Sequence, residues 1–259
     1  MPFATGARGA RIYYETRGTA GPPAILIQGL GLSSRFWFDL PDRLATGRDP
    51  WRVLTPDHRG VGRSDRPLGP YGMRTMADDV AGVLDHAGLV LLATTAGFPH
   101  VRLPRLSALA YFLGLPLTGR LNRDPIDPAF ARLLLSRKDV PRAGELLSGW
   151  PAALKTEPTS LRVFAAHFAA VLGHATGAAL RQVACPTVIV SGDDDALLPA
   201  QNSRVLARLI PGAHLEIVPG GHILPANDPE CVRRALDRAR DMSDYEPAPV
   251  AAGLADRTA

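Results

Sequence analysis

The sequence predicts an α/β fold in which a mostly parallel open sheet is flanked by helices and carries a helical insertion. An apolar run at Val188–Gly192 is followed by a helix pattern and a second strand, which together form a crossover unit. Another apolar run, Ala24–Ile27, leads through a glycine-rich turn into a further helix pattern. Between these units, residues 98–182 show helical periodicity interrupted by prolines, which indicates an inserted helical segment.

The composition is that of a folded globular protein. Apolar residues make up 46% and charged residues 21% of the 259 residues, enough for one large core with an insertion. The net charge of +4 comes from scattered basic residues, so we expect no nucleic-acid partner. We also expect a cytoplasmic protein without membrane association, because no apolar leader and no run of 18 apolar residues is present. The two cysteines form no metal or disulfide framework, and no cofactor is expected.

The N-terminal part predicts two strands before the first glycine-rich turn. Residues 10–17 alternate in polarity, which predicts an edge strand paired with the residues before it. Ala24–Ile27 is continuously apolar and predicts a central strand. The turn Gln28–Gly31 follows it, and Ser33 or Ser34 caps the next helix.

A second glycine-rich turn follows the strand predicted at Trp51–Thr55. In the sequence DHRGVGRS, residues 57–64, two glycines and short polar residues allow the backbone to coil tightly. We therefore interpret His58 and Ser64 as turn residues rather than catalysts. A helix pattern over residues 76–87 then leads into a strand at Leu89–Thr95.

Three aspartates, Asp193 to Asp195, follow the strand at Val188–Gly192, and His222 follows a strand predicted at residues 214–218. Ligands of open α/β sheets bind beyond the carboxyl ends of the strands, so an acid and a base there are placed for chemistry. The alternative is that the aspartates only cap and solvate a helix start, and that His222 is an ordinary loop histidine.

In this order and spacing, the turns resemble motifs of the α/β-hydrolase fold family. The family's acid turn has the pattern G-x-x-D-x-x-x-P, which selects Asp195, and its histidine turn has the pattern G-G-H, which selects His222. The turn at residues 57–64 matches its D-x-R-G-x-G-x-S motif. The resemblance implies that Asp195 orients His222 and that His222 is a general base.

The same resemblance implies an oxyanion hole and a division into core and cap. Backbone N–H groups of Gly29 and Leu30 would form the oxyanion hole, although Gln28 stands where the family usually has histidine. Residues 1–97 and 183–241 would form the core, and residues 98–182 a helical cap. Separately, the composition of residues 242–259 predicts a disordered tail.

The family's nucleophile elbow, G-x-S-x-G, is missing. No serine lies in this pattern, and no cysteine or aspartate replaces it in an elbow. The chain is shorter than the family pattern by about one strand and one helix, a unit of roughly 30 residues. The strand Leu89–Thr95 could move into the vacated central position. Apolar surface left open by the missing helix would favour a homodimer.

The resemblance implies a hydrolase of carboxylic esters, lactones or similar small acyl substrates, weak or inactive because the nucleophilic serine is absent. One alternative is that Asp195 and His222 act as a base without a covalent intermediate. Others are a catalytically dead protein that binds an apolar ligand, and a degenerate product of an internal deletion. In each functional case the expected partner is a small apolar or ester-like molecule.

Overall fold

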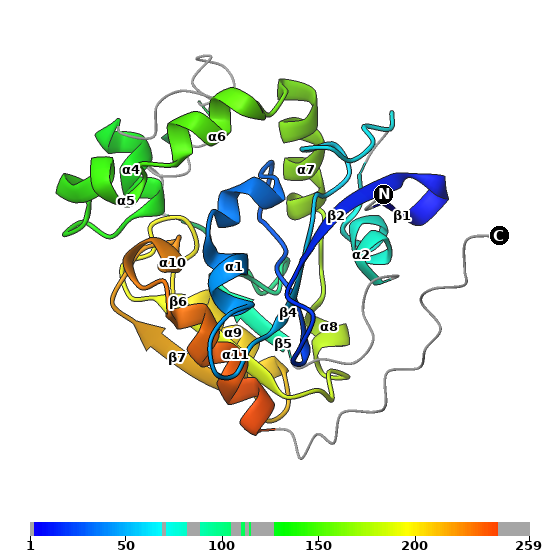
Figure 1. The fold of residues 1–259 in the computed structure, drawn as a ribbon. Coiled ribbons are helices and arrows are strands. Elements are labelled where there is room, and N and C mark those ends of the chain that lie inside the picture. The colour runs from blue at the N-terminus through cyan, green and yellow to red at the C-terminus, as the bar shows by residue number, and fades with distance from the viewer. Residues whose placement is uncertain are drawn as a thin grey trace.

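The computed structural model describes residues 3–68, 71–81, 89–104, 110–111, 114 and 127–242. The strands of these residues form two sheets, one with the order β1-β2-β4-β3 and one with the order β5-β6-β7 (Figure 1). The strands are β1 (Phe3–Thr5), β2 (Arg11–Arg17), β3 (Pro23–Ile25), β4 (Arg52–Pro56), β5 (Leu89–Leu92), β6 (Thr187–Gly192) and β7 (His214–Val218).

The first sheet is mixed and the second is parallel. β2 pairs antiparallel with β1 and with β4, and β3 runs parallel to β4. In the second sheet β6 lies between β5 and β7, parallel to both. The strand predicted at residues 10–17 therefore pairs with the residues before it, as expected, but it is an interior strand rather than an edge because β4 pairs along its other side.

The sheet is divided at the position where the sequence lacks a strand and a helix. β3, predicted as a central strand, lies at the end of its sheet. Among the described residues β5 pairs only with β6, so it does not occupy the vacated position beside β3, an arrangement that the sequence allowed. β3 has three residues and starts with Pro23, which lacks an N–H group, so it offers few hydrogen bonds to a new neighbour.

Side chains, rather than backbone hydrogen bonds, join the two sheets. Ala24 and Leu26, at β3, belong to the same buried cluster as Val188 and Val190 of β6. Val90 and Leu92 of β5 pack against this cluster, and helix α11 (Cys231–Asp241) contributes its apolar face. The space that a central strand would fill is thus reduced by packing.

The remaining helices cover the sheets and one end of the molecule. Those outside the insertion are α1 (Leu40–Leu44), α2 (Met73–Ala81), α9 (Gln201–Leu209) and α10 (Leu224–Asn227). Short 3-10 helices lie at Ala7–Gly9, Ser34–Trp37 and Val140–Arg142. None of the described helices is both long enough and apolar enough to cross a membrane.

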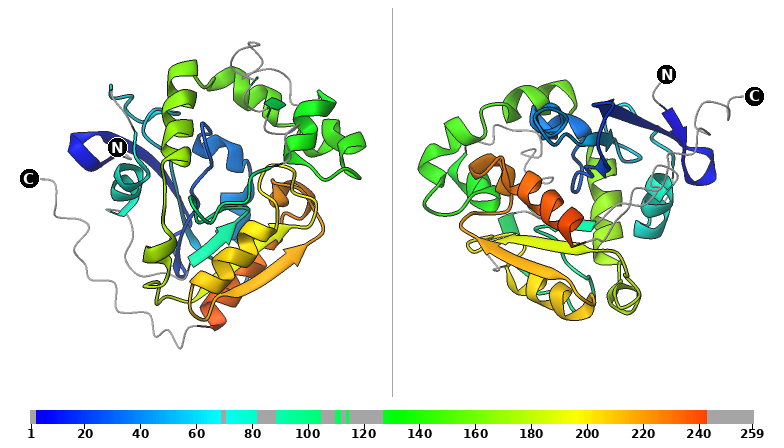
Figure 2. Two further views of the ribbon diagram at one scale, coloured as in Figure 1. Left: turned by 180° about the vertical axis from the view of Figure 1, so that it is seen from behind. Right: turned by 60° about the horizontal axis from the view of Figure 1, so that its bottom comes forward.

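The insertion between β5 and β6 carries the helices that we call the cap helices. They are α4 (Pro128–Leu134), α5 (Ala143–Leu146), α6 (Trp150–Thr156), α7 (Leu161–Leu172) and α8 (Gly177–Leu180). Helices α4 to α7 form an arch at one end of the molecule (Figure 2). Part of the cap predicted at residues 98–182, part of the helix predicted at 76–87, and the tail after residue 242 lie outside the described residues.

Candidate active site

A carboxylate and an imidazole meet beyond the carboxyl ends of β6 and β7. Asp195 Oδ2 lies 2.9 Å from Nδ1 of His222. The Asp195 side chain is fully buried, whereas 23% of the His222 side chain is exposed. Because a carboxylate accepts hydrogen bonds, Nδ1 carries the proton of the neutral ring and Nε2 keeps a lone pair. Among the described residues Nε2 has no hydrogen-bond partner, so it can accept a proton from a bound molecule.

The three aspartates make different contacts. Asp193 Oδ1 accepts from the N–H of Gly220 at 3.0 Å, which ties the acid turn to the histidine turn. Asp194 binds Arg132 of the cap at 2.8 Å. Asp195 Oδ1 accepts from the N–H groups of Leu197 and Leu198, leaving Oδ2 for His222. None of them caps α9, whose N-cap is Ala200, so the helix-capping alternative does not explain this cluster.

Two glycines allow the acid and histidine turns to touch through their backbones. A Cβ atom at Gly192 would lie 2.4 Å from the carbonyl oxygen of Gly221 and 2.5 Å from that of Gly220. A Cβ atom at Gly221 would lie 2.4 Å from the carbonyl carbon of Leu135. Backbone atoms at such distances cannot move aside cheaply, so these positions need glycine. At these two glycines the backbone of the acid turn therefore contacts that of the histidine turn, and the backbone of the histidine turn contacts that of the cap, with no side chain between them.

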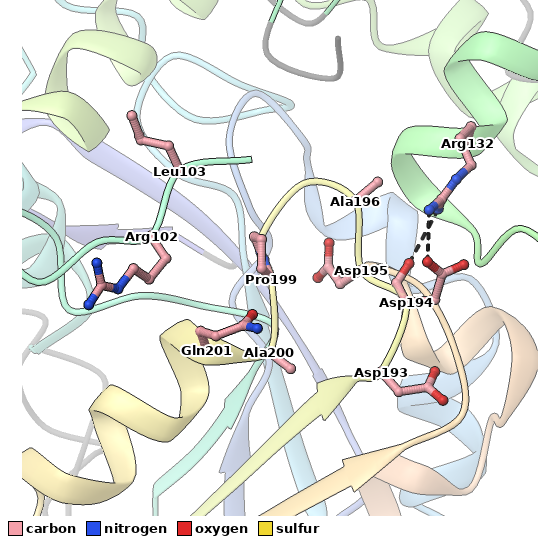
Figure 3. Close-up of a pocket in the computed structure, with 10 residues that line it drawn as sticks. All are labelled: Arg102, Leu103, Arg132, Asp193, Asp194, Asp195, Ala196, Pro199, Ala200 and Gln201. Atoms are coloured by element: carbon pink, nitrogen blue, oxygen red, sulfur yellow. Dashed lines mark hydrogen bonds and ion pairs between the residues drawn. The ribbon is translucent and has the colours of Figure 1, made fainter. Parts of the chain in front are cut away.

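A cavity of about 390 Å³ opens beside the acid turn (Figure 3). Asp195 is among its lining residues, and His222 is not. Arg132 lies on one side of the acid turn, and Arg102 and Leu103 lie on the other. The cavity therefore borders the acid turn, and its lining includes charged residues.

The predicted oxyanion loop lies at the end of β3. The N–H of Gly29 donates to the Gln28 side-chain oxygen at 3.3 Å, whereas the N–H of Leu30 has no hydrogen-bond partner among the described residues. The Gln28 carbonyl accepts from His58 Nε2 at 3.1 Å. Leu32 packs against the same apolar cluster as Ile223, the residue after His222. The two halves of the predicted site thus share one cluster, although they follow strands of different sheets.

His167 is a positioning residue that the sequence does not reveal. Its Nδ1 accepts from the N–H of Gly31 at 3.2 Å, and its Nε2 donates to the carbonyl of Arg59 at 2.9 Å. Only a neutral ring can make both bonds, and burial lowers the pKa of His167 in agreement with this form. Both partners are backbone groups more than 100 positions away, so no local pattern marks this residue.

We expect His58 to make the stability of the protein depend on pH. Burial, with a contribution from neighbouring His167, lowers the pKa of His58 from 6.5 to about 4. The folded state therefore binds fewer protons than the unfolded state, and the free energy of unfolding falls as the pH decreases from about 6.5 to about 4. Replacing His58 by Gln should flatten this slope by on the order of 1 kcal/mol per pH unit. Urea unfolding between pH 7 and pH 5 measures it.

The control is His214→Gln, which removes a histidine that lies on β7 with 40% of its side chain exposed and should keep the wild-type slope. Parallel slopes for wild type and His58→Gln would contradict the prediction.

Serines and cysteines of the described residues do not supply a nucleophile to His222. Ser33 and Ser34, the best remaining candidates, are 2% and 7% exposed, and the hydroxyl of Ser33 donates to Glu157. Burial raises the pKa of Cys231 to about 12, which keeps it a thiol. Among the described residues no serine or cysteine forms a hydrogen bond with His222.

Comparison with known proteins identifies relatives along almost the whole chain. The model of the α/β hydrolase fold matches residues 22–94, and that of a serine hydrolase family, FSH1, matches residues 147–233. The protein named "Putative carbamate hydrolase RutD" from Azorhizobium caulinodans is 30% identical over 271 residues, covering 91% of this chain and 97% of the relative. Its namesake from Caulobacter sp. is 28% identical over 87% of this chain and 94% of the relative.

Solved structures share the fold. A thermophilic esterase from Thermogutta terrifontis superposes with a TM-score of 0.68 at 24% identity, covering 92% of this chain and 96% of the esterase. The enol-lactonase from Burkholderia xenovorans superposes with a TM-score of 0.73 at 18% identity, covering 93% of this chain and all of the lactonase. At these identities the likeness concerns the fold alone.

Proposed function

This chain belongs to the α/β-hydrolase fold family, and we propose that it is a weak hydrolase of small acyl substrates in which His222 activates water directly. The observation that carries the proposal is the Asp195–His222 hydrogen bond at 2.9 Å, with Nε2 unoccupied. A helix cap or an ordinary loop histidine would not need a buried carboxylate aligned on Nδ1. A base of this kind functions without a serine, but it forms no covalent intermediate.

The proposed reaction has two proton transfers. His222 Nε2 takes a proton from water as the oxygen attacks the substrate carbonyl, and Asp195 stabilises the resulting imidazolium. The N–H of Leu30, with that of Gly29 once Gln28 releases it, donates to the oxyanion. The protonated His222 then gives its proton to the leaving oxygen or nitrogen as the C–O or C–N bond breaks, which leaves an acid and an alcohol or amine.

The substrate class follows from the relatives and from the chemistry. Esters, lactones and carbamates all present a carbonyl beside a leaving oxygen or nitrogen, and these are the groups in the names of the similar proteins. Turnover should be low, because without a nucleophilic serine the reaction depends on water activated by a general base, which contributes only about 10²–10⁴-fold.

An active-site serine probe tests the absence of a covalent intermediate. We expect a fluorophosphonate to leave the intact mass of the protein unchanged, and p-nitrophenyl acetate to be hydrolysed in a steady state without a burst. A labelled serine, mapped by peptide mass spectrometry, or a stoichiometric acyl-enzyme would contradict direct water activation. A complete lack of turnover across ester, lactone and carbamate substrates would leave only ligand binding.

A further inference from the structure

One segment of the cap contacts both turns of the Asp195–His222 pair. Arg132, on α4, donates from Nη2 to the Asp194 carboxylate at 2.8 Å and from Nη1 to the Asp194 carbonyl at 3.3 Å. Figure 3 shows this pair beside Asp195. The backbone N–H of Arg137 donates to the second oxygen of Asp194 at 2.7 Å. The segment thus holds both oxygens of the residue that precedes the acid.

The same segment holds the histidine turn. The N–H of Ile223 donates to the carbonyl of Leu134 at 3.1 Å. A Cβ atom at Gly221 would lie 2.6 Å from the Leu134 carbonyl oxygen and 2.6 Å from the Ser136 nitrogen. Gly221 and Ile223, the residues on either side of His222, therefore both contact the cap backbone.

The far end of the cap holds the oxyanion loop. The N–H of Gly31 donates to His167 on α7, and the Gly31 carbonyl accepts from the Thr159 hydroxyl. Glu157, after α6, accepts from the Ser33 hydroxyl and, at 3.0 Å, from Arg35. One buried cluster connects the two ends: it contains Phe36, Trp150 and Leu134, with Ile223 packed against it.

We infer that the cap helices, rather than the sheet, set the position of His222 relative to the oxyanion loop, and that Arg132 is a positioning residue acting through Asp194. In the described residues no strand pairing joins β3 to β5, so the two halves of the site belong to separate sheets. A charge-assisted guanidinium contact with a carboxylate fixes orientation as well as distance. A misplacement of a catalytic group by about 1 Å can lower the rate about 10²-fold, so a contact between Arg132 and Asp194 that fixes the position of the acid turn matters for function.

This inference rests on the proposed role of His222 as a base, but its test needs no turnover. The Nδ1 proton of His222 can be observed by ¹H NMR at low field, and its loss in Asp195→Asn assigns it. In Arg132→Met we expect this resonance to disappear through exchange with water. The amides of Leu197 and Leu198, which donate to Asp195, should exchange about tenfold faster, as expected when a bond to a charged group is weakened.

Arg132→Lys should partly restore the resonance, because an ammonium group keeps the charge but lacks the planar fork with which Arg132 holds Asp194 and the Leu135 carbonyl at the same time. The matched control is Arg137→Met. The Arg137 side chain is 59% exposed and lies 3.8 Å from Asp194, while its backbone N–H makes the close contact. This variant should keep the wild-type resonance and exchange rates.

A second variant tests, without changing a charge, whether the cap positions the histidine turn. Gly221→Ala should push the histidine turn away from Leu134–Ser136 and remove the resonance, whereas Gly144→Ala, with no atom within 4 Å of the added Cβ, should not. Unchanged spectra in both Arg132→Met and Gly221→Ala would overturn the inference, as would an equal loss in Arg137→Met. If these spectra change as expected but His222→Ala leaves turnover intact, the positioning inference stands and the proposed function falls.

Discussion

Replacing His222 by Ala should reduce the hydrolysis of p-nitrophenyl acetate by about 10²-fold or more, since a positioned general base contributes about 10²–10⁴-fold. The reason is local: among the described residues His222 Nε2 has no hydrogen-bond partner, whereas Nδ1 and both Asp195 oxygens are occupied. The measurement is the steady-state rate at neutral pH, corrected for buffer-catalysed hydrolysis.

The control for this prediction is His214→Ala. His214 also lies beside a carboxylate, with Nε2 3.3 Å from Glu216, but on strand β7 and with 40% of its side chain exposed. It should keep wild-type turnover. Equal rates for wild type and His222→Ala would show that any hydrolysis takes place elsewhere on the protein.

Replacing Asp79 by Ala should lower the free energy of unfolding by about 3–5 kcal/mol, the cost of leaving one partner of a buried ion pair unpaired. Arg59 Nε donates to Asp79 Oδ2 at 2.6 Å, and the two side chains are 5% and 1% exposed. Asp79 also accepts from the N–H of Ala7 at 2.9 Å, so the substitution removes an anchor of the N-terminal segment. Urea unfolding followed by circular dichroism measures the loss.

Glu145→Ala is the control for this stability prediction, because Glu145 forms an exposed pair with Arg142 within the cap. Exposed pairs contribute little, and we expect no measurable change for this variant. A loss in Asp79→Ala no larger than that in Glu145→Ala would show that the buried guanidinium finds another partner or reaches water.

Local turn chemistry explains which parts of the molecule were predictable from the sequence. The strand predicted at residues 214–218 appears as β7, and the helix predicted after the aspartates appears as α9. Gly192, three residues before Asp195, and the glycines before His222 are visible in the sequence. They are the residues that let the backbones of the acid turn and the histidine turn approach each other closely. The proximity of Asp195 and His222 was therefore open to sequence reasoning, although it does not establish their roles.

Long-range pairing explains what the sequence did not predict. Whether β5 pairs with β3 depends on two strand edges that are 64 positions apart, from Ile25 to Leu89, and on the side chains that fill the space between them, and neither is encoded locally. The same applies to His167, whose partners are backbone groups of two distant turns. The sequence pattern assigns no separate role to Asp194 within the run of three aspartates, because its partner Arg132 lies 62 positions away along the chain.

The division of the sheet has a consequence for how the native state loosens. Strands that are hydrogen-bonded in one sheet unfold together. Apolar packing between two separate sheets, in contrast, resembles the interface between two domains. Partial opening of β5-β6-β7 then leaves the hydrogen bonds of β1-β2-β4-β3 intact, so the chain has two potential cooperative units. Helix α11, whose buried face shares one core cluster with residues of both sheets, is the element whose detachment would weaken the packing between them.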